Sequence, residues 1–289
     1  MAGTKRTIAI TGTSNGFGRS AAKTFLSAGW RVYATMRDSG GRNASAAAEL
    51  RSLGAEVLEL DVTSDASVDA AASAILAAGP VDVLVNNAGN AYMGVAEAFT
   101  PAAAERQFAT NVFGPLRVNR AFLPAMRERR SGLIVYVSSV VGRMVVPFMG
   151  VYSASKWALE ALAESSSYEL RPFGVDVALV EPGAYGTNVF ASMVSPDDTA
   201  RLAAYGDVGK IFEQLGAGLA ESAEGRSVDD IGNAILALAN APAGTRPLRT
   251  IVPENPAIAQ INEHAAPIQR DILAGYGLGA LLAPEAAAV

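Results

Sequence analysis

Short apolar segments alternate with helical patterns through the first two thirds of this 289-residue chain. The segments are rich in β-branched residues and mostly continuous in apolar character, as strands buried on both faces of a sheet are. They lie at 7–11, 31–36, 56–62, 81–87, 133–139 and 175–182, with a last one at 249–253. This alternation predicts right-handed crossovers and an α/β fold: a doubly wound parallel sheet, Rossmann-like, with helices on both faces.

The segments between the strands carry the start and stop signals of helices. Glycine directly follows the first three helical patterns, at 19–28, 44–53 and 65–78, and glycine favours the left-handed conformation of a helix end. Thr100 as cap and Pro101 in the first turn predict one long helix that continues past Asn111 to about residue 130. Further helices are expected at 152–173 and, behind Ser227 with Asp230, at 228–240.

Length and composition favour one domain over residues 1–289, because a chain that is 50% hydrophobic can bury a large core. The alternation breaks down between 188 and 226, which we interpret as a substrate lid. Residues 254–289 are expected to be a C-terminal extension.

Several classes of function are disfavoured by the composition. The net charge is −5, with 23 basic and 28 acidic residues spread along the chain, so no basic face for nucleic acid is expected. The chain has no cysteine and a single histidine, His264, which leaves no thiolate or multi-histidine metal site. No apolar stretch approaches the roughly 20 residues of a membrane span. We expect a cytoplasmic protein whose redox chemistry needs an organic cofactor.

A glycine-rich turn follows the first predicted strand. Gly12 allows a sharp turn, Gly16 a close approach to a pyrophosphate, and Gly18 close packing of the next helix. The positive end of that helix then faces the phosphates. The turn therefore predicts a dinucleotide site that runs through Gly12, Ser14, Asn15, Gly16, Phe17 and Gly18.

The ends of the next strands refine this site. Met36 and Arg37 occupy the strand end where NAD-binding folds usually carry a carboxylate, and a guanidinium matches a 2′-phosphate. This favours NADP over NAD. Asp61 and Val62 are candidates for contact with the adenine. The small residues Asn87, Ala88 and Gly89 would let the backbone pass close to the cofactor.

Ser139, Tyr152 and Lys156 are the candidate catalytic residues. Reducing a carbonyl by hydride requires a proton donor, and a phenol needs a nearby cation to work in the reverse direction. Lys156 lies one helical turn after Tyr152, and Ser139 ends a strand, where α/β sheets place ligand groups. Asn111 is a plausible member of a polar relay that holds a water linking Lys156 to bulk solvent.

The chain resembles the short-chain dehydrogenase/reductase family in its single-domain form. The motifs that carry the resemblance occur in the family's order, at 11–18, 61–62, 86–89, 138–142, 152–156 and 182–187. The resemblance implies a catalytic tetrad of Asn111, Ser139, Tyr152 and Lys156, the serine being the one thirteen residues before the tyrosine. It also implies that Tyr152 and Lys156 contact the cofactor, and that Pro182, Gly183 and Thr187 hold its nicotinamide end.

The resemblance implies metal-free, NAD(P)-dependent interconversion of a small-molecule carbonyl compound and an alcohol, and residues 33–38 resemble the NADP-preferring members. A homodimer or homotetramer is expected. Asn15 departs from the basic residue that many NADP users carry at this position. Two alternatives stay open: a non-catalytic dinucleotide sensor, and an epimerase, dehydratase or dehalogenase variant. His264 is expected at the surface rather than as a catalytic base.

A largely apolar substrate pocket is expected, which favours medium-sized lipophilic ketones or secondary alcohols over sugars and charged acids. Its apolar side chains fall in two groups, the loop before Tyr152 and the lid: Val140, Val141, Met144, Val145 and Phe148, then Phe190, Met193, Leu202, Tyr205, Ile211, Phe212 and Leu215.

Overall fold

The computed structural model describes residues 5–186 and 193–282, and in this part of the chain seven parallel strands form one sheet. The strands are β1 (Thr7–Thr11), β2 (Arg31–Met36), β3 (Glu56–Glu59), β4 (Val83–Asn86), β5 (Gly132–Val137), β6 (Val175–Pro182) and β7 (Arg249–Val252). Their order is β3-β2-β1-β4-β5-β6-β7, so the winding reverses between β1 and β4. The doubly wound α/β fold is thereby confirmed.

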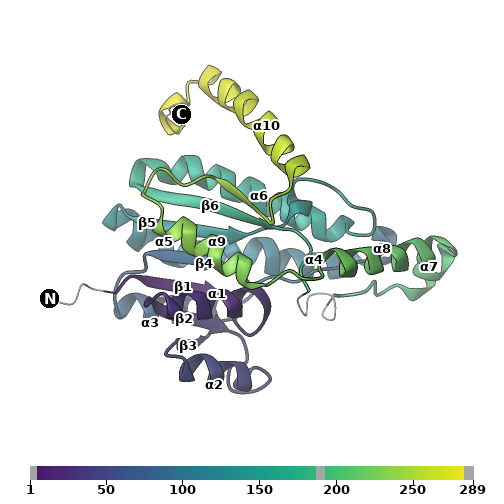
Figure 1. Cartoon of the computed structure of the whole chain (residues 1–289), viewed down its shortest axis with the longest axis horizontal. Helices are drawn as coiled ribbons and strands as arrows, with labels where there is room; N and C mark the ends of the chain where they lie inside the picture. Colours follow the sequence, from purple (N-terminus) through teal and green to yellow (C-terminus); the bar gives the residue numbers. More distant parts are fainter. Residues whose placement is uncertain (1–4, 187–192, 283–289) are drawn as a thin grey trace.

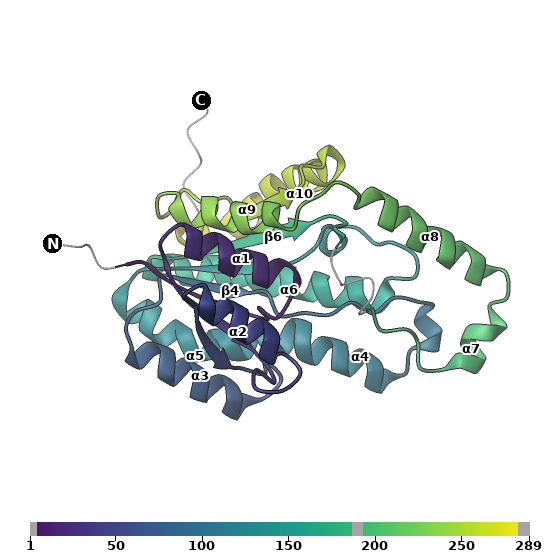
Figure 2. The same cartoon turned by 60° about the horizontal axis from the view of Figure 1, so that its bottom comes forward.

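Helices cover both faces of the sheet (Figures 1 and 2). One face carries α1 (Gly16–Ser27), α2 (Ala44–Ser52) and α9 (Asp229–Asn240), and the other carries α3 (Asp65–Ala77), α5 (Gly114–Arg129) and α6 (Gly150–Leu170). Successive strand residues supply the two cores in turn: Ile8 and Ile10 pack on the α1 side, and Ala9 packs on the α3 side. This explains why the strands are apolar at nearly every position.

Four strands end earlier than the sequence predicts, at Glu59, Asn86, Val137 and Val252 instead of at 62, 87, 139 and 253. After β3, the Leu60 amide still donates to Met36 O (3.0 Å), but the next amide, that of Asp61, turns to Ser67 Oγ (2.9 Å). The residues beyond the strand ends are thus released from the sheet and form its carboxyl edge.

The long helix predicted from Pro101 to about residue 130 is interrupted. It consists of α4 (Pro101–Phe108), a π-helical turn at Ala109–Phe113, and α5. Thr100 caps the start as predicted, since its hydroxyl accepts from Ala103 N (3.2 Å). Pro115 in the first turn of α5 has no N–H to continue the α-helical bonding, which favours a break directly before it.

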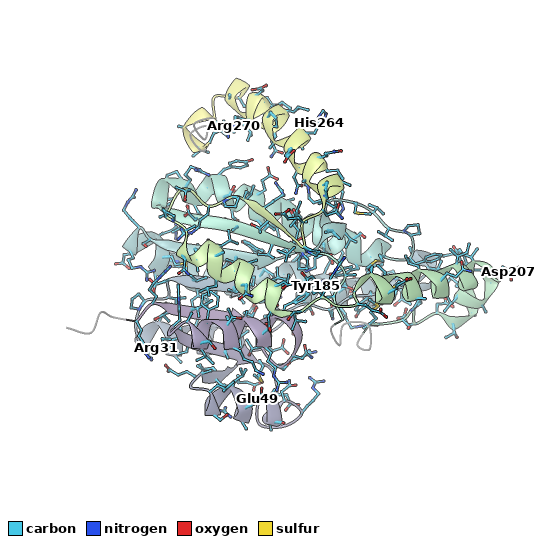
Figure 3. The ribbon with its side chains drawn as sticks, viewed as in Figure 1. Arg31, Glu49, Tyr185, Asp207, His264 and Arg270 are labelled. Carbon is cyan, nitrogen blue, oxygen red and sulfur yellow. The ribbon has the colours of Figure 1, made fainter. Side chains whose placement is uncertain are left out.

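Helices also occur in the two segments where the sequence predicted none. The proposed lid contains α7 (Thr199–Ala204) and α8 (Val208–Ser222), and the C-terminal extension contains α10 (Pro256–Gly275). Asn255 begins α10, with its side chain accepting from Ala257 N (3.1 Å) and Ile258 N (3.3 Å). Pro267, inside α10, masks this helix in the sequence. His264 lies exposed on α10, as expected (Figure 3).

Among the described residues, no helix is both long and apolar enough to span a membrane. Within the same residues, no group of three or more histidine, aspartate or glutamate side chains is arranged to hold a metal ion.

Close packing of α1 on α9 depends on Gly232. A Cβ added at Gly232 would lie 2.6 Å from Thr24 Oγ1 and 3.2 Å from Ala21 Cα of α1. We predict that Gly232→Ala lowers the free energy of unfolding by about 1–3 kcal/mol, because the two helices must move apart. The measurement is denaturant-induced unfolding followed by circular dichroism.

Gly216→Ala, inside α8, is the control for the effect of replacing a helical glycine by alanine where the added Cβ contacts no neighbouring helix. A Cβ at Gly216 meets no atom within 4 Å, so this variant should be neutral or stabilising by about 0.5–1 kcal/mol. Equal destabilisation by both variants would contradict the role given to the α1–α9 contact.

Candidate active site

The turn after β1 is held against the end of β4. The Thr11 hydroxyl accepts from the amides of Asn87 and Ala88 (3.0 Å each), and Asn87 Nδ2 donates to Thr11 O (2.8 Å) and Gly12 O (3.0 Å). A Cβ on Gly12 would lie 2.8 Å from Ala88 Cα, and Gly12 has a φ of 70°. Only glycine fits this approach without strain.

A cleft of about 530 Å³ opens along the carboxyl edge of the sheet beside this turn. Most of the predicted cofactor residues line it: Gly12, Ser14, Asn15, Gly16, Phe17, Arg37, Asp61, Val62, Asn87, Ala88 and Gly89. Gly18 instead lies buried behind the cleft, where a Cβ would come within 2.3 Å of Asn87 Nδ2. This agrees with the packing role expected for Gly18.

The cleft has further lining residues that the sequence reasoning missed: Arg42, Asn43, Leu60, Thr63, Asn90, Thr110 and Val194. Arg42 and Asn43 lie in the loop before α2. Asn43 Nδ2 donates to Arg37 O (2.6 Å), which joins this loop to the end of β2. An arginine so close to Arg37 in sequence is the signal that could have identified the loop as part of the site.

Two carboxylates near the end of β2, those of Asp38 and Glu59, accept hydrogen bonds from nearby backbone amides. Glu59 accepts from the amides of Asp38 and Ser39 and from the Ser39 hydroxyl, the last two at 2.8 and 2.7 Å. Asp38 accepts from the amide of Arg42 (3.0 Å). Neither Asp38 nor Glu59 lines the cleft, whereas Arg37 and Arg42 do.

Tyr152, Lys156 and Ser139 come together where β5 meets α6. Lys156 is buried and donates from Nζ to Val137 O (2.8 Å), which places the ammonium 5.8 Å from the centre of the Tyr152 ring. Ser139 begins the 3₁₀ turn Val140–Gly142 and contacts Pro182 O through its hydroxyl (3.4 Å). A phenol, a hydroxyl and an ammonium therefore share one small region.

Burial changes the proton affinities of this group. It raises the pKa of Tyr152 to about 12, while the neighbouring Ser139 hydroxyl opposes the rise. It lowers the pKa of Lys156 to about 8, and the Glu160 carboxylate opposes that fall. At neutral pH the phenol therefore holds its proton, and the ammonium is mostly charged.

Asn111 lies buried in the π-helical turn. Its side chain accepts from Asn90 N (3.0 Å) and donates to Asn90 O (3.0 Å) and to Ser155 Oγ (3.1 Å). Ser155 in turn donates to Tyr152 O (2.7 Å). Because Asn90 lines the cleft, Asn111 connects the inner end of the cleft to the first turn of α6. The relay water expected at Asn111 stays a prediction.

Tyr152 belongs to an apolar cluster. It packs against the buried side chains of Met93, Val141 and Met149, and other partly buried side chains pack against the same three: Val140, Val146, Met193, Leu215 and Leu219. Of the predicted pocket residues, Val140, Val141, Met193 and Leu215 belong to this cluster, whereas Met144 and Val145 are 37% and 67% exposed. Phe190 lies outside the described residues.

The chain after β6 runs beside this group. The Gly183 amide donates to Val252 O (2.8 Å), and Arg226 Nη1 donates to Ala184 O (2.9 Å). Pro182, Gly183 and Ser139 therefore lie together, while Thr187 falls outside the described residues. Val194 forms a bridge with Tyr92 and lines the cleft.

The chain is similar to several known proteins. The chain is 44% identical to human retinol dehydrogenase 8 over 188 residues, which cover 63% of this chain and 60% of that protein. It is similar to the crystal structure of a short-chain dehydrogenase from Streptomyces avermitilis, with a TM-score of 0.75, 34% identity, and coverage of 96% of this chain and 97% of the other.

A short-chain dehydrogenase/reductase from Burkholderia phymatum, solved in complex with NAD, is also similar, with a TM-score of 0.74, 25% identity, and coverage of 99% and 98% of the two chains. The profile of the short chain dehydrogenase family matches residues 6–198. That match includes the glycine-rich turn, Asn111, Ser139, Tyr152 and Lys156, and the chain therefore belongs to the short-chain dehydrogenase/reductase family.

Proposed function

We propose that this protein is an NADP(H)-dependent oxidoreductase that interconverts a ketone or aldehyde with the corresponding alcohol. The observation that carries the proposal is the meeting of Tyr152, Ser139 and Lys156. Asn111 links this group, through Ser155 and Asn90, to the cleft lined by the glycine-rich turn. A sensor would need that turn but no proton donor. When bound, the nicotinamide cofactor supplies or accepts a hydride.

In the reduction direction, Tyr152 donates its proton to the carbonyl oxygen, and Ser139 orients that oxygen by hydrogen bonding. The pKa of about 12 keeps the phenol protonated before the reaction. In the oxidation direction, Tyr152 must accept a proton, and the Lys156 ammonium stabilises the phenolate by charge. When the cofactor is bound, Lys156 would also hold its nicotinamide ribose.

The described cleft fits a dinucleotide, because Gly12 and Gly16, both with positive φ, let the backbone approach a pyrophosphate. We assign the phosphates to this turn and the 2′-phosphate to Arg37 and Arg42. Support for NADP over NAD comes from the two guanidinium groups and from the engagement of Asp38 and Glu59 with nearby amides.

The substrate is proposed to be a lipophilic compound of medium size. Support comes from the apolar cluster that packs against the Tyr152 ring and includes Met193 and Leu215 of the proposed lid, residues 188–226. Such a wall excludes water from the reacting carbonyl and provides no partner for a charged group.

We also propose that the protein acts in the cytoplasm as a homodimer or homotetramer. Large apolar side chains lie exposed on the outer surfaces of α5 and α6, with Leu116 at 46%, Trp157 at 44% and Leu162 at 36%. A second copy of the chain would cover this surface.

Tyr152→Phe should abolish most of the activity, because the ring stays and the transferable proton is lost. We expect kcat for ketone reduction to fall ~10³-fold or more, with NADPH affinity little changed. Tyr168→Phe makes the same change on α6 away from the cleft, where the hydroxyl donates to Glu164 (2.8 Å), and should leave kcat nearly unchanged. Near-normal turnover by the Tyr152 variant would contradict the proposed mechanism.

Arg37→Ala should reduce the preference for NADPH over NADH by roughly 1–3 kcal/mol, since a charge-assisted contact is removed. The comparison is kcat/KM with each cofactor. Arg51→Ala, an exposed arginine of α2 that does not line the cleft, serves as the matched control. Equal efficiency of the parent enzyme with both cofactors would refute the NADP assignment.

Leu215→Ala should raise KM for aryl and alicyclic ketones about 10-fold, because roughly 1–2 kcal/mol of apolar contact is lost. Ile211→Ala removes an apolar side chain from the same helix at a position that is 55% exposed, and should have little effect. A parent enzyme with higher kcat/KM for polyhydroxylated or anionic carbonyl compounds would disprove the apolar pocket.

A further inference from the structure

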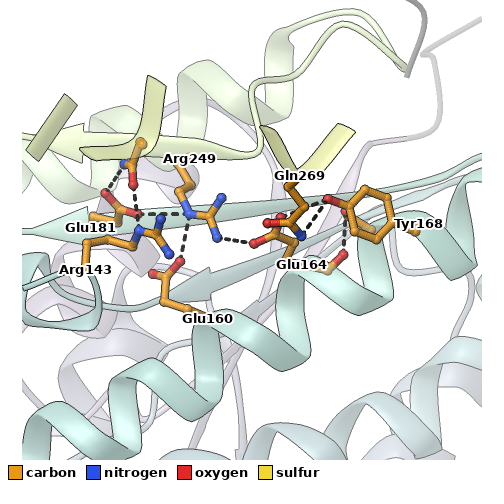
Figure 4. A network of polar contacts seen from close by, with 9 residues as sticks. Arg143, Glu160, Glu164, Tyr168, Glu181, Arg249 and Gln269 are labelled. Atoms are coloured by element: carbon orange, nitrogen blue, oxygen red, sulfur yellow. Dashed lines mark hydrogen bonds and ion pairs between the residues drawn. The ribbon is translucent and has the colours of Figure 1, made fainter. Parts of the chain in front are cut away.

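A buried ionic cluster lies between α6, β6 and β7, behind the catalytic group (Figure 4). Arg249 contacts three carboxylates: Glu160 at 2.9 Å, Glu164 at 2.6 Å and Glu181 at 3.4 Å. The side chains of Glu160, Glu181 and Arg249 are only 2%, 0% and 11% exposed. Burying so many charges costs desolvation energy that a hydrophobic packing would avoid, which suggests a role beyond stability.

Helix α10 closes this cluster from outside. Asn262 donates to Glu181 Oε2 (2.9 Å) and accepts from Arg143 Nε (2.7 Å). Farther along, Gln269 donates to the Tyr168 hydroxyl (3.3 Å), which itself donates to Glu164. The charged groups around Glu160 are therefore Arg249 on β7, Glu181 on β6, Arg143 after the 3₁₀ turn, and Lys156 and Glu164 on α6.

Glu160 connects the cluster to the active site. It lies one helical turn after Lys156 on α6, so the two side chains share a helix face. Arg249 holds one oxygen of Glu160, and the other lies under Gly142, beside the Ser138 hydroxyl. A Cβ at Gly142 would come within 2.9 Å of Ser138 Oγ and 3.4 Å of Glu160 Oε1. The Ser138 hydroxyl acts on Glu160 in the same direction as Arg249, because both oppose the rise in the pKa of Glu160 that burial causes.

We propose that Glu160 is a positioning residue whose negative charge, fixed by Arg249, keeps the Lys156 ammonium protonated at the active site. The proposal rests on the function proposed above, because the Lys156 charge matters only where it holds the cofactor ribose and stabilises the phenolate.

The electrostatics of the neighbouring groups support this role. Burial raises the pKa of Glu160, and Arg249 opposes the rise. The pKa of Glu181 is raised to about 7 by its burial and by the charge of Glu160. Glu181 therefore takes up a proton near neutral pH, which reduces the repulsion on an ionised Glu160. Burial already lowers the pKa of Lys156 to about 8. Loss of the Glu160 charge would lower it further, so Lys156 would lose its proton at a lower pH.

The experiment compares the pH dependence of NADPH binding, followed by fluorescence, and of kcat/KM for ketone reduction. Both decline at high pH as Lys156 loses its proton. In Glu160→Gln this decline should begin ~1 pH unit lower, the size expected for removing one nearby charge from a partly screened site. Glu160→Asp keeps the charge and should restore the parent profile. Glu164→Gln removes another Arg249 partner, one turn farther from Lys156, and should leave the profile unshifted.

Glu160→Gln could instead lower kcat at every pH while NADPH binding and kcat/KM decline at the same pH as in the parent enzyme. That result would show that Glu160 is only structural and would overturn the proposal. If Glu160→Gln does not fold, Glu160→Met tests the same point, because it adds no polar group and leaves Arg249 paired with Glu164. The expected shift is the same, and its absence in folded protein overturns the proposal. A parent enzyme that neither binds NADPH nor reduces ketones would instead refute the proposed function.

Discussion

The approach of the β1–α1 turn to the end of β4 determines where everything else in this molecule can lie. The contact between Gly12 and Ala88 has no room for a Cβ, and the Thr11 hydroxyl is shared by two amides of the β4 end. β1 and β4 are also the strands between which the winding of the sheet reverses. A ligand crevice is expected outside the strand ends at such a reversal, and the cleft opens there, beside this junction.

Charge burial is the second constraint on the fold. Arg249 compensates carboxylates from α6 and β6, and Asn262 of α10 closes the same cluster. The last strand and the last helix therefore contribute to the structure behind the active site, although neither lines the cleft. A C-terminal segment with few buried apolar side chains is held here by polar contacts.

The fold and most of the cleft could be predicted from sequence because the patterns that specify them lie within short stretches of the chain. Continuous apolar strands, glycine-terminated helices and the glycine-rich turn each indicate their own structure. The π-helical turn at Ala109–Phe113 and the helix α10 could not. Pro115 favours a break before α5 but does not specify the form of that break, and Pro267 lies inside α10. Val194 and Glu160 were missed for a related reason. Their partners lie far away in sequence, and only the folded chain brings Val194 to Tyr92 and Glu160 to Arg249.

The bridge between Val194 and Tyr92 joins the cleft to the apolar cluster that contains Tyr152. Met93 N donates to Val194 O (3.1 Å), and Val194 N donates to Ala91 O (3.0 Å), so the segment leading to α7 and α8 is fastened at both sides of Val194. Val194 lines the cofactor cleft, whereas its neighbour Met193 packs in the apolar cluster around Tyr152. Two adjacent residues thus form part of the wall of both compartments. A displacement of this segment would therefore move the walls of both compartments together.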